Sequence, residues 1–367
     1  MKRRVVSIFS GIDCLGLGFR EGFDVVLAVE KEKKACETLV ANKEIFHPNL
    51  EVWNRDVLEV SDSEIRQFEG VDGIVGGSPC QAFSVAKGGF DPEDERIKLI
   101  FEYLRWVKII QPKFFLFENV EGLFQKDKLA IFESFLEMAK NLGYKVEYKI
   151  LNCHDYGSAQ KRKRVIAVGF KDDLNVNFAF PKPVENKKYV RDILDCDVTG
   201  EYVEARDRIK EIMPHVPEGG YWKHLKTDEL LEKALGVNYK KRAGGMTGVC
   251  RRLHRDKPCP TLVTSPVQNT TLLYHPIEDR PLSITEYKRG QGIPQSYNIV
   301  GNLRDQYKFI GNGVPVEMAY ELSKSISKAL DDIESKTDRD ISQQNIQTVE
   351  YKAEIKVESN NQLCFAI

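Results

Sequence analysis

Cys80 lies in the stretch GGSPCQAFS (76–84), between a proline and a glutamine and shortly after an apolar run. A cysteine that only fills a core needs no such setting, because buried thiols behave as small apolar groups. Two other segments carry groups that could act with a thiol: Glu118 in ENV, and Arg162 and Arg164 in QKRKR. A thiolate forms near neutral pH in a cationic neighbourhood, so this set suits nucleophilic catalysis.

Alternating strand-like and helix-like segments must position these residues, and they predict an α/β fold with a mostly parallel sheet and helices on both faces. The expected strands are 5–9, 24–30, 71–77, 113–120, YKVEYKILN and RVIAVGF, and the expected helices are 34–42, 98–110 and 128–143. Cys80 and Glu118 then emerge at the carboxyl edge of the sheet, where open α/β folds bind ligands. Each residue alone is more simply a packed thiol, a solvated acid or a basic turn; their convergence favours a site.

The turn after the first strand, FSGIDCLGLGF, could receive a ligand on its backbone and at a helix N-terminus. The dinucleotide pattern G-x-G-x-x-G is absent. Glu30 ends the second strand, and Asp56 follows a third expected strand around 55–57. Acids at such places hold ribose hydroxyls or an adenine amino group. Since glycine turns and acidic strand ends are also common in packing, adenosine binding and a purely structural role remain equal alternatives here.

The reactive set suits one reaction well. C5 of cytosine is a poor nucleophile, but a thiolate that adds at C6 makes C5 enamine-like, so that C5 can attack a methyl sulfonium. A protonated carboxyl or a strong hydrogen bond at N3 stabilises the adduct, and a guanidinium can hold the O2 edge.

In their order along the chain, these motifs resemble those of the C5-cytosine DNA methyltransferases. The resemblance covers residues 4 to 330. It rests on FSGIDCLGLGF, the acids Glu30 and Asp56, GGSPCQAFS, ENV, QKRKRVIAVG, RRLHRDKPCPTL (251–262) and GNGVPVEMAY (311–320). It implies a Rossmann-like, doubly wound S-adenosylmethionine-dependent methyltransferase fold with a smaller target-recognition domain. It also implies DNA (cytosine-5-)-methyltransferase activity on a flipped-out cytosine.

The resemblance implies a role for each motif residue. Cys80 is the nucleophile, Glu118 engages cytosine N3 and the amino group, and Arg162 and Arg164 orient the base and support a mobile loop at 81–97. The cofactor is S-adenosyl-L-methionine and the product S-adenosyl-L-homocysteine. The implied cofactor-binding residues are Phe9, Ser10, Gly11, Glu30, Asp56, Val57, Leu99 and Asn312.

Four positions depart from the family pattern. Asp13-Cys14 stands where a second glycine pair is usual, which puts an added acid near the expected sulfonium or amino-acid end of the cofactor. Lys31 stands where an aromatic or apolar residue often flanks the adenine, and its methylene stem could substitute. Gly313 replaces a more usual Ala or Ser.

Double-stranded DNA is the expected partner, with about residues 172–250 reading a short target. The expected DNA-binding residues are Gln81, Ser84, Lys240, Lys241, Arg242, Arg251 and Arg252. Without the resemblance, the basic and aromatic segments here are more simply solvated loops. The expected domains are a catalytic and cofactor-binding domain (1–171), a target-recognition domain (172–280), a return segment (281–330) and a polar, flexible tail (331–367).

Composition narrows the alternatives. The 367 residues carry 54 basic and 55 acidic side chains, so the net charge of the chain does not indicate nucleic-acid binding. Eight cysteines without Cys-x-x-Cys or metal-ligand spacing, and no signal peptide or membrane-length apolar run, indicate a cytoplasmic protein with no metal. We expect a monomer, with a separate restriction endonuclease as a candidate partner. The competing functions are an RNA (tRNA) cytosine-5 methyltransferase, a catalytically inactive DNA-binding relative, and a nicotinamide-dependent dehydrogenase.

Overall fold

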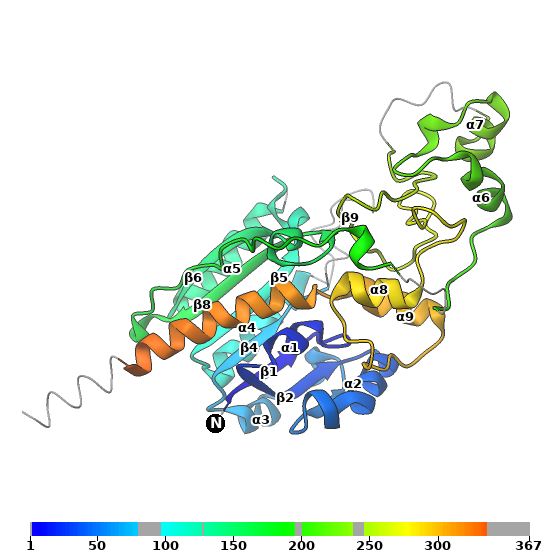
Figure 1. The fold of residues 1–367 in the computed structure, drawn as a ribbon. Helices are drawn as coiled ribbons and strands as arrows, with labels where there is room; N and C mark the ends of the chain where they lie inside the picture. The colour runs from blue at the N-terminus through cyan, green and yellow to red at the C-terminus, as the bar shows by residue number, and fades with distance from the viewer. Residues whose placement is uncertain (1, 80–96, 127, 195–199, 238–245, 336–367) are drawn as a thin grey trace, which may run out of the picture.

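The chain folds into a large α/β domain with a smaller lobe beside it, which carries α6 and α7 (Figure 1). The computed structural model describes residues 2–79, 97–126, 128–194, 200–237 and 246–335. Cys80, Gln81, Ser84, Lys240, Lys241 and Arg242 lie outside the described residues.

A seven-stranded sheet in the order β3-β2-β1-β4-β5-β8-β6 forms the centre of the large domain. Its strands are β1 (Arg3–Ile8), β2 (Phe23–Glu30), β3 (Glu51–Asn54), β4 (Gly73–Gly76), β5 (Phe114–Val120), β6 (Tyr144–Asn152) and β8 (Lys163–Lys171). The first five strands are parallel, and β8 runs antiparallel to both β5 and β6. The expected mostly parallel, doubly wound α/β sheet is confirmed.

Helices cover both faces of this sheet. In the large domain they are α1 (Cys14–Phe19), α2 (Lys33–Phe46), α3 (Asp62–Ile65), α4 (Lys98–Ile110), α5 (Leu129–Asn141), α8 (Ile284–Gln291), α9 (Leu303–Asn312) and a long helix at 316–335. Helices α4 and α5 pack on one face, while α1 and the 316–335 helix, orange in Figure 1, pack on the other.

The two-residue period of β5 shows how the sequence builds both cores. Phe115 and Phe117 belong to the core beneath α4 and α5, whereas Phe114 and Leu116 belong to the core beneath the 316–335 helix. Successive side chains of a strand point to opposite faces, so a continuous apolar run marks a strand that is buried on both sides.

Two boundaries differ from the expectation. The third strand is Glu51–Asn54, and residues 55–57 follow it, because Asp56 caps the 3-10 helix Val57–Glu59. The last helix continues to residue 335, so 331–335 belong to it and not to a flexible tail. Its polar end is held by Arg3 of β1, whose guanidinium pairs with Asp331 at 2.7 Å and Glu334 at 2.8 Å.

The small lobe has a hydrophobic core of its own. Its core side chains run from Ala205 to Tyr274 and come partly from α6 (Asp207–Ile212) and α7 (Asp228–Leu235). Leu253, Cys259 and Leu262 instead pack with α8 and α9. A two-stranded parallel pair, β7 (Gln160–Lys161) with β9 (Cys259–Pro260), joins this segment to the large domain. None of the helices in the described ranges is long and apolar enough to cross a membrane.

The 316–335 helix is expected to stabilise the sheet through its buried face. Leu322 is fully buried, so Leu322→Ala should lower the free energy of unfolding by about 2–5 kcal/mol. Urea denaturation followed by tryptophan fluorescence measures this change. Lys328→Ala on the exposed side of the same helix is the matched control, and an equal loss in both variants would contradict this packing.

Candidate active site

The candidate site lies where the strand order reverses. Along the chain, β1 leads to β2 and β3 on one side, while β4 leads to β5 on the other. Open α/β sheets bind ligands in the crevice at such a point. At this edge Ile8 lies opposite Gly76, and a Cβ at Gly76 would lie 2.1 Å from the Ile8 carbonyl oxygen. Glycine at this position therefore lets the segment that leads to Cys80 pass close to β1.

Glu118 at the end of β5 lies against that segment. A Cβ placed on Gly77 would be 2.6 Å from Glu118 Oε2, so the carboxyl group sits beside a residue three positions before Cys80. Arg164 Nε pairs with Glu118 Oε1 at 2.8 Å, and the two side chains are only 12% and 14% exposed. The structure thus brings Glu118 and Arg164 together next to the segment that precedes the cysteine.

The pairing of β5 with β8 explains how Arg164 reaches Glu118. Glu118 lies opposite Ile166, and Val120 lies opposite Arg164, in an antiparallel register. Since side chains two residues apart on a strand share a face, Arg164 and Glu118 are diagonal neighbours on the same face. A long guanidinium can bridge this diagonal.

Asn119 is a site residue that the sequence reasoning missed. Its Nδ2 donates to Ser78 Oγ at 3.2 Å, its Oδ1 accepts from the Val120 N–H at 2.8 Å, and it is 1% exposed. Asn119 therefore fixes the backbone just before Cys80 to β5. A polar side chain within an apolar strand was the available signal.

Arg162 lies at the edge of the sheet and is buried. Its guanidinium donates to the carbonyl oxygens of Leu262 at 3.1 Å and Asn312 at 3.5 Å. These bonds tie the 251–262 motif and the end of α9 to the sheet edge. The expected role of Arg162 in orienting the base and supporting the loop stays a prediction.

Gln160 helps to connect the same segments to the sheet edge, and the sequence reasoning missed it as well. Its Nε2 donates to Gln291 Oε1 at 2.8 Å and to the Gly290 carbonyl at 3.2 Å, while its Oε1 accepts from the Leu262 N–H at 2.9 Å. Its position beside the arginines in QKRKR was the only signal in the sequence. Together Gln160 and Arg162 hold three distant segments in place around the edge.

The described cysteines are unsuited to nucleophilic chemistry. Cys14, Cys36, Cys153, Cys250 and Cys259 are all buried. Burial raises the pKa of Cys250 to about 11 and that of each of the other four to about 12. Such thiols stay protonated and unreactive near neutral pH. Within the described part of the chain, no group of three or more His, Cys, Asp or Glu side chains is arranged to hold a metal ion.

The turn after β1 forms the other half of the site. Phe9 and Gly11 both have positive φ values, of 54° and 56°. Glu30 Oε2 accepts from the Gly11 N–H at 2.9 Å and its Oε1 from the Glu32 N–H at 2.8 Å, so two main-chain donors fix the carboxylate at the end of β2. A Cβ on Gly11 would meet nothing within 4 Å, which leaves open space in front of the turn.

The remaining expected cofactor residues surround this turn. Phe9 and Leu99 are half-buried and pack on the same core, which also contains Val57. The Ser10 hydroxyl donates to the Ser7 carbonyl at 2.9 Å. Asn312 is the last residue of α9 and is exposed.

Lys31 and Asp56 form an ion pair beside the turn. Lys31 Nζ lies 3.2 Å from Asp56 Oδ2, while Asp56 Oδ1 accepts from the Leu58 N–H at 3.1 Å. The lysine side chain is 72% exposed. The methylene stem of Lys31 is therefore available at the surface where an aromatic ring was expected.

Asp13 and Cys14, which stand where the family usually has a glycine pair, are both buried. Asp13 is 1% exposed and Cys14 is 3% exposed, so the added acid does not face the open space at Gly11. Gly313 lies against Cys14, because a Cβ there would be 2.5 Å from the Cys14 sulfur.

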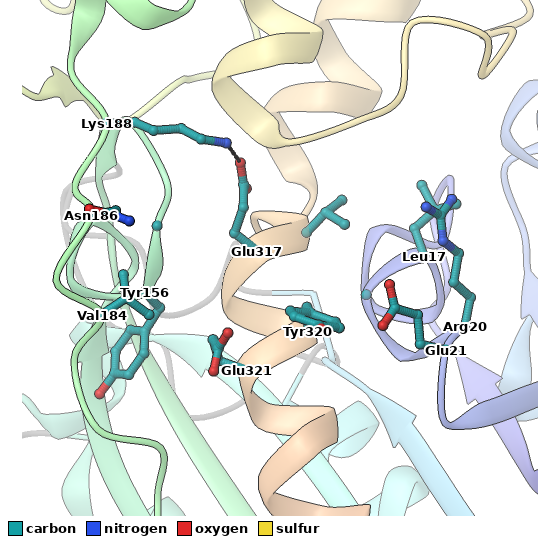
Figure 2. Close-up of a pocket in the computed structure, with 13 residues that line it drawn as sticks. Leu17, Arg20, Glu21, Tyr156, Val184, Asn186, Lys188, Glu317, Tyr320 and Glu321 are labelled. Carbon is teal, nitrogen blue, oxygen red and sulfur yellow. Dashed lines mark hydrogen bonds and ion pairs between the residues drawn. The ribbon is translucent and has the colours of Figure 1, made fainter.

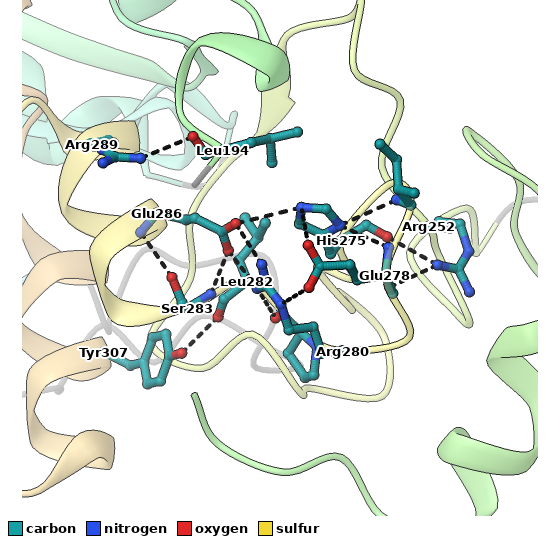
Figure 3. A network of polar contacts seen from close by, with 12 residues as sticks. Leu194, Arg252, His275, Glu278, Arg280, Leu282, Ser283, Glu286, Arg289 and Tyr307 are labelled. Carbon is teal, nitrogen blue, oxygen red and sulfur yellow. Dashed lines mark hydrogen bonds and ion pairs between the residues drawn. The ribbon is translucent and has the colours of Figure 1, made fainter. Parts of the chain in front are cut away.

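Arg252 is corrected from a DNA contact to a structural residue. It is 5% exposed, and its guanidinium donates to the carbonyl oxygens of His275 and Glu278 (Figure 3). It also donates to the carbonyl oxygens of Val216 and Met213 and pairs with Asp279. Its neighbour Arg251 is half-buried and donates through Nε to the Leu272 carbonyl at 3.0 Å. Both arginines organise the small lobe.

A second polar network connects the small lobe to α8. Arg280 forms a two-point ion pair with the fully buried Glu286, at 2.8 and 2.9 Å, and His275 Nε2 lies 3.6 Å from the same carboxylate (Figure 3). The arginine holds the pKa of Glu286 below its ordinary value in spite of burial. This pair anchors the lobe on the large domain.

A hollow of about 380 Å³ lies elsewhere, between α1, the 316–335 helix and the segment at 184–188 (Figure 2). Its lining mixes acidic, basic and aromatic side chains, including Arg20, Glu317 and Tyr320. It contains none of the residues that the sequence predicts for catalysis, cofactor or DNA, so the candidate site remains the sheet edge.

Comparisons with known proteins identify the family of the chain. The family model for C-5 cytosine-specific DNA methylase matches residues 3–328. The chain is 38% identical over 339 residues to the type II methyltransferase M.PspPI of Psychrobacter, which covers 89% of this chain and 79% of that protein. It is 36% identical to M.Eco47II of Escherichia coli, over 90% of this chain and 80% of that protein.

A solved structure shares the fold. It is a candidate DNA modification methyltransferase encoded within an E. coli prophage, and it aligns with a TM-score of 0.68 at 24% identity over 90% of this chain and all of that one. With its site at the reversal of the strand order and its motifs in sequence, the chain belongs to the C-5 cytosine-specific DNA methylase family.

Proposed function

We propose that the chain transfers a methyl group from S-adenosyl-L-methionine to C5 of a flipped-out cytosine in a short duplex DNA target. The observation that carries this proposal is the Glu118–Arg164 pair, held beside the segment that leads to Cys80 at the carboxyl edge of the sheet. A carboxyl group and a guanidinium thus meet beside the chain segment that precedes the cysteine. Family membership supports the same reaction.

The turn after β1 fits the proposed cofactor. The open space at Gly11 allows close approach to the backbone, and the fixed carboxylate of Glu30 retains lone pairs that can accept from ribose hydroxyls. Asp56, Phe9 and Leu99 would hold the adenine, and Asn312 would lie at the amino-acid end. S-adenosylmethionine supplies an electrophilic methyl group, and the product is S-adenosyl-L-homocysteine.

The protein's own residues activate the base. The Cys80 thiolate would add to C6, while Glu118 in its protonated form would donate a hydrogen bond to N3, and Arg164 would orient that carboxyl and the O2 edge. Once C5 carried the methyl group and S-adenosyl-L-homocysteine had been released, C5 would give its proton to solvent, and the electrons of that C–H bond would re-form the C5–C6 double bond as the thiolate left C6. Arg162 and Gln160 support these groups indirectly, because their hydrogen bonds keep the surrounding segments in place.

We infer that the two parts of the chain have different roles. The small lobe within 172–280 contacts the DNA target, and residues 1–171 and 281–335 form the large domain. The names of the relatives, type II methyltransferases, favour a restriction–modification setting with a separate endonuclease. Flipping the base out of the stack is needed because addition to C6 and methyl transfer to C5 occur at the faces of the ring, which neighbouring bases cover in the duplex.

Cys80→Ala should abolish methyl transfer, because Cys80 is the proposed nucleophile and the five thiols in the described part of the chain are buried. The measurement is transfer of tritium from labelled S-adenosylmethionine to C5 of cytosine in duplex DNA. Cys259→Ala, which removes a buried thiol, is the matched control and should retain turnover when it is folded. Near-normal turnover by Cys80→Ala would rule out the nucleophile assignment, and label in transfer RNA but not in DNA would favour the RNA alternative.

Arg164→Met should lower the single-turnover rate at saturating DNA by about 100-fold, because it removes the ion pair that orients Glu118. Lys163→Met is the matched control on the same strand. Lys163 pairs with Glu121 at 3.1 Å, but both side chains are half exposed, and such pairs contribute little. If both variants lost the same small factor, the Glu118–Arg164 pair would not be part of the catalytic machinery.

A further inference from the structure

Asp13 adopts a backbone conformation that few residues other than glycine tolerate. Its φ and ψ are 53° and 46°, in the left-handed region, and it lies between the cofactor turn and the first residue of α1. Aspartate and asparagine are among the residues that tolerate this region. The same position is 1% exposed, so a carboxylate is buried directly beneath the turn.

The contacts of Asp13 connect β1, the turn and α1. Its Oδ1 accepts from the Ser7 hydroxyl at 2.8 Å and from the Gly16 N–H at 3.1 Å. Its main-chain N–H donates to the Ser10 carbonyl at 2.8 Å, and its carbonyl accepts from the Leu17 N–H at 2.9 Å. One residue therefore fixes both ends of the segment that carries Ser10 and Gly11.

The second carboxylate oxygen points at the end of α2. Oδ2 lies 4.0 Å from His47 Nε2, and within the described residues neither atom has a hydrogen-bond partner. Burial raises the pKa of Asp13 and lowers the pKa of His47. The other charged groups that act on His47 are Lys2, Arg20 and Asp24.

The carboxylate of Asp13 packs directly against Gly16. A Cβ on Gly16 would lie 1.9 Å from Asp13 Oδ2 and 2.5 Å from its Cγ. The carboxyl group therefore fills the space that a larger side chain at 16 would need. Tyr297 adds a further constraint, because its hydroxyl donates to the Ile12 carbonyl at 2.9 Å.

We propose that Asp13 is a positioning residue for the cofactor, which holds the Phe9–Gly11 turn in its binding geometry through its bonds to Ser7, Ser10 and Gly16. The inference rests on the proposed binding of S-adenosylmethionine at this turn. Glu30 bonds to the Gly11 N–H, so a displaced turn also displaces the carboxylate that meets the ribose. Pre-organising a binding loop raises affinity because less ordering remains to be done on binding.

The test compares Asp13→Gly with Asp13→Asn. Glycine keeps the left-handed backbone and removes the side chain, whereas asparagine keeps an acceptor for Ser7 and Gly16 and adds a donor for His47. Calorimetry should show S-adenosylmethionine binding about tenfold weaker in Asp13→Gly and within about threefold of wild type in Asp13→Asn. In turnover assays KM for the cofactor should rise, with kcat and KM for DNA unchanged.

Thr227→Gly is the matched control. Thr227 caps α7 in the small lobe through the Leu230 N–H, so its loss weakens a helix cap far from the turn and should leave cofactor affinity unchanged. Unchanged affinity in Asp13→Gly, with a wild-type chain that binds, overturns the positioning role alone. A wild-type chain that does not bind S-adenosylmethionine overturns the proposed cofactor as well.

A double-mutant cycle checks the packing without the cofactor. Gly16→Ala should lower the Tm strongly in the wild-type chain, because its Cβ meets the carboxylate, and much less in the Asp13→Gly background. Additive Tm changes would show that the carboxylate does not occupy this space and would overturn the inference.

Discussion

The parallel pairing of β1 with β4 is the constraint on which the site depends. It places Ile8 opposite Gly76, so the turn after β1 and the segment that leads to Cys80 leave the sheet side by side. Both segments need a close backbone approach, and the glycine at 76 allows it. In the proposed reaction, the nucleophile and the methyl donor must both reach the same cytosine ring. Two adjacent parallel strands that end at the same edge can bring the nucleophile and the cofactor close enough for this.

The edge is stabilised from distant parts of the chain. Asn119 fixes Ser78, and Arg162 and Gln160 hold the segment at 259–262. These three groups are buried and bonded mainly to backbone atoms, so they set positions without taking part in the chemistry. The reactive groups can therefore lie at an open edge, because polar residues behind them supply the rigidity.

The sequence predicted the large domain well where apolar periodicity was strong. Residues 98–110 form α4 with the expected bounds, and the 113–120 run is β5, because both segments are buried on well-defined faces. Predictions were less accurate where packing partners are remote in sequence. Glu51–Asn54 is short and partly exposed, and residues 331–335 are mostly polar, so their pairing with β2 and with Arg3 identifies them as a strand and a helix end.

Residue types predicted the site better than they predicted each residue's orientation. Arg162 and Arg164 lie two residues apart in one motif, yet Arg164 reaches Glu118 and Arg162 is buried among carbonyl oxygens. Arg252 looked like a phosphate contact, but it binds the backbone of its own lobe. A sequence shows that a guanidinium is present. The direction of the arginine side chain follows from the register of the strands and from the position of carbonyl oxygens that have no other hydrogen-bond donor. Asp13 shows the same limit, because its charge suggested contact with the cofactor, whereas burial turns it into a support beneath the turn.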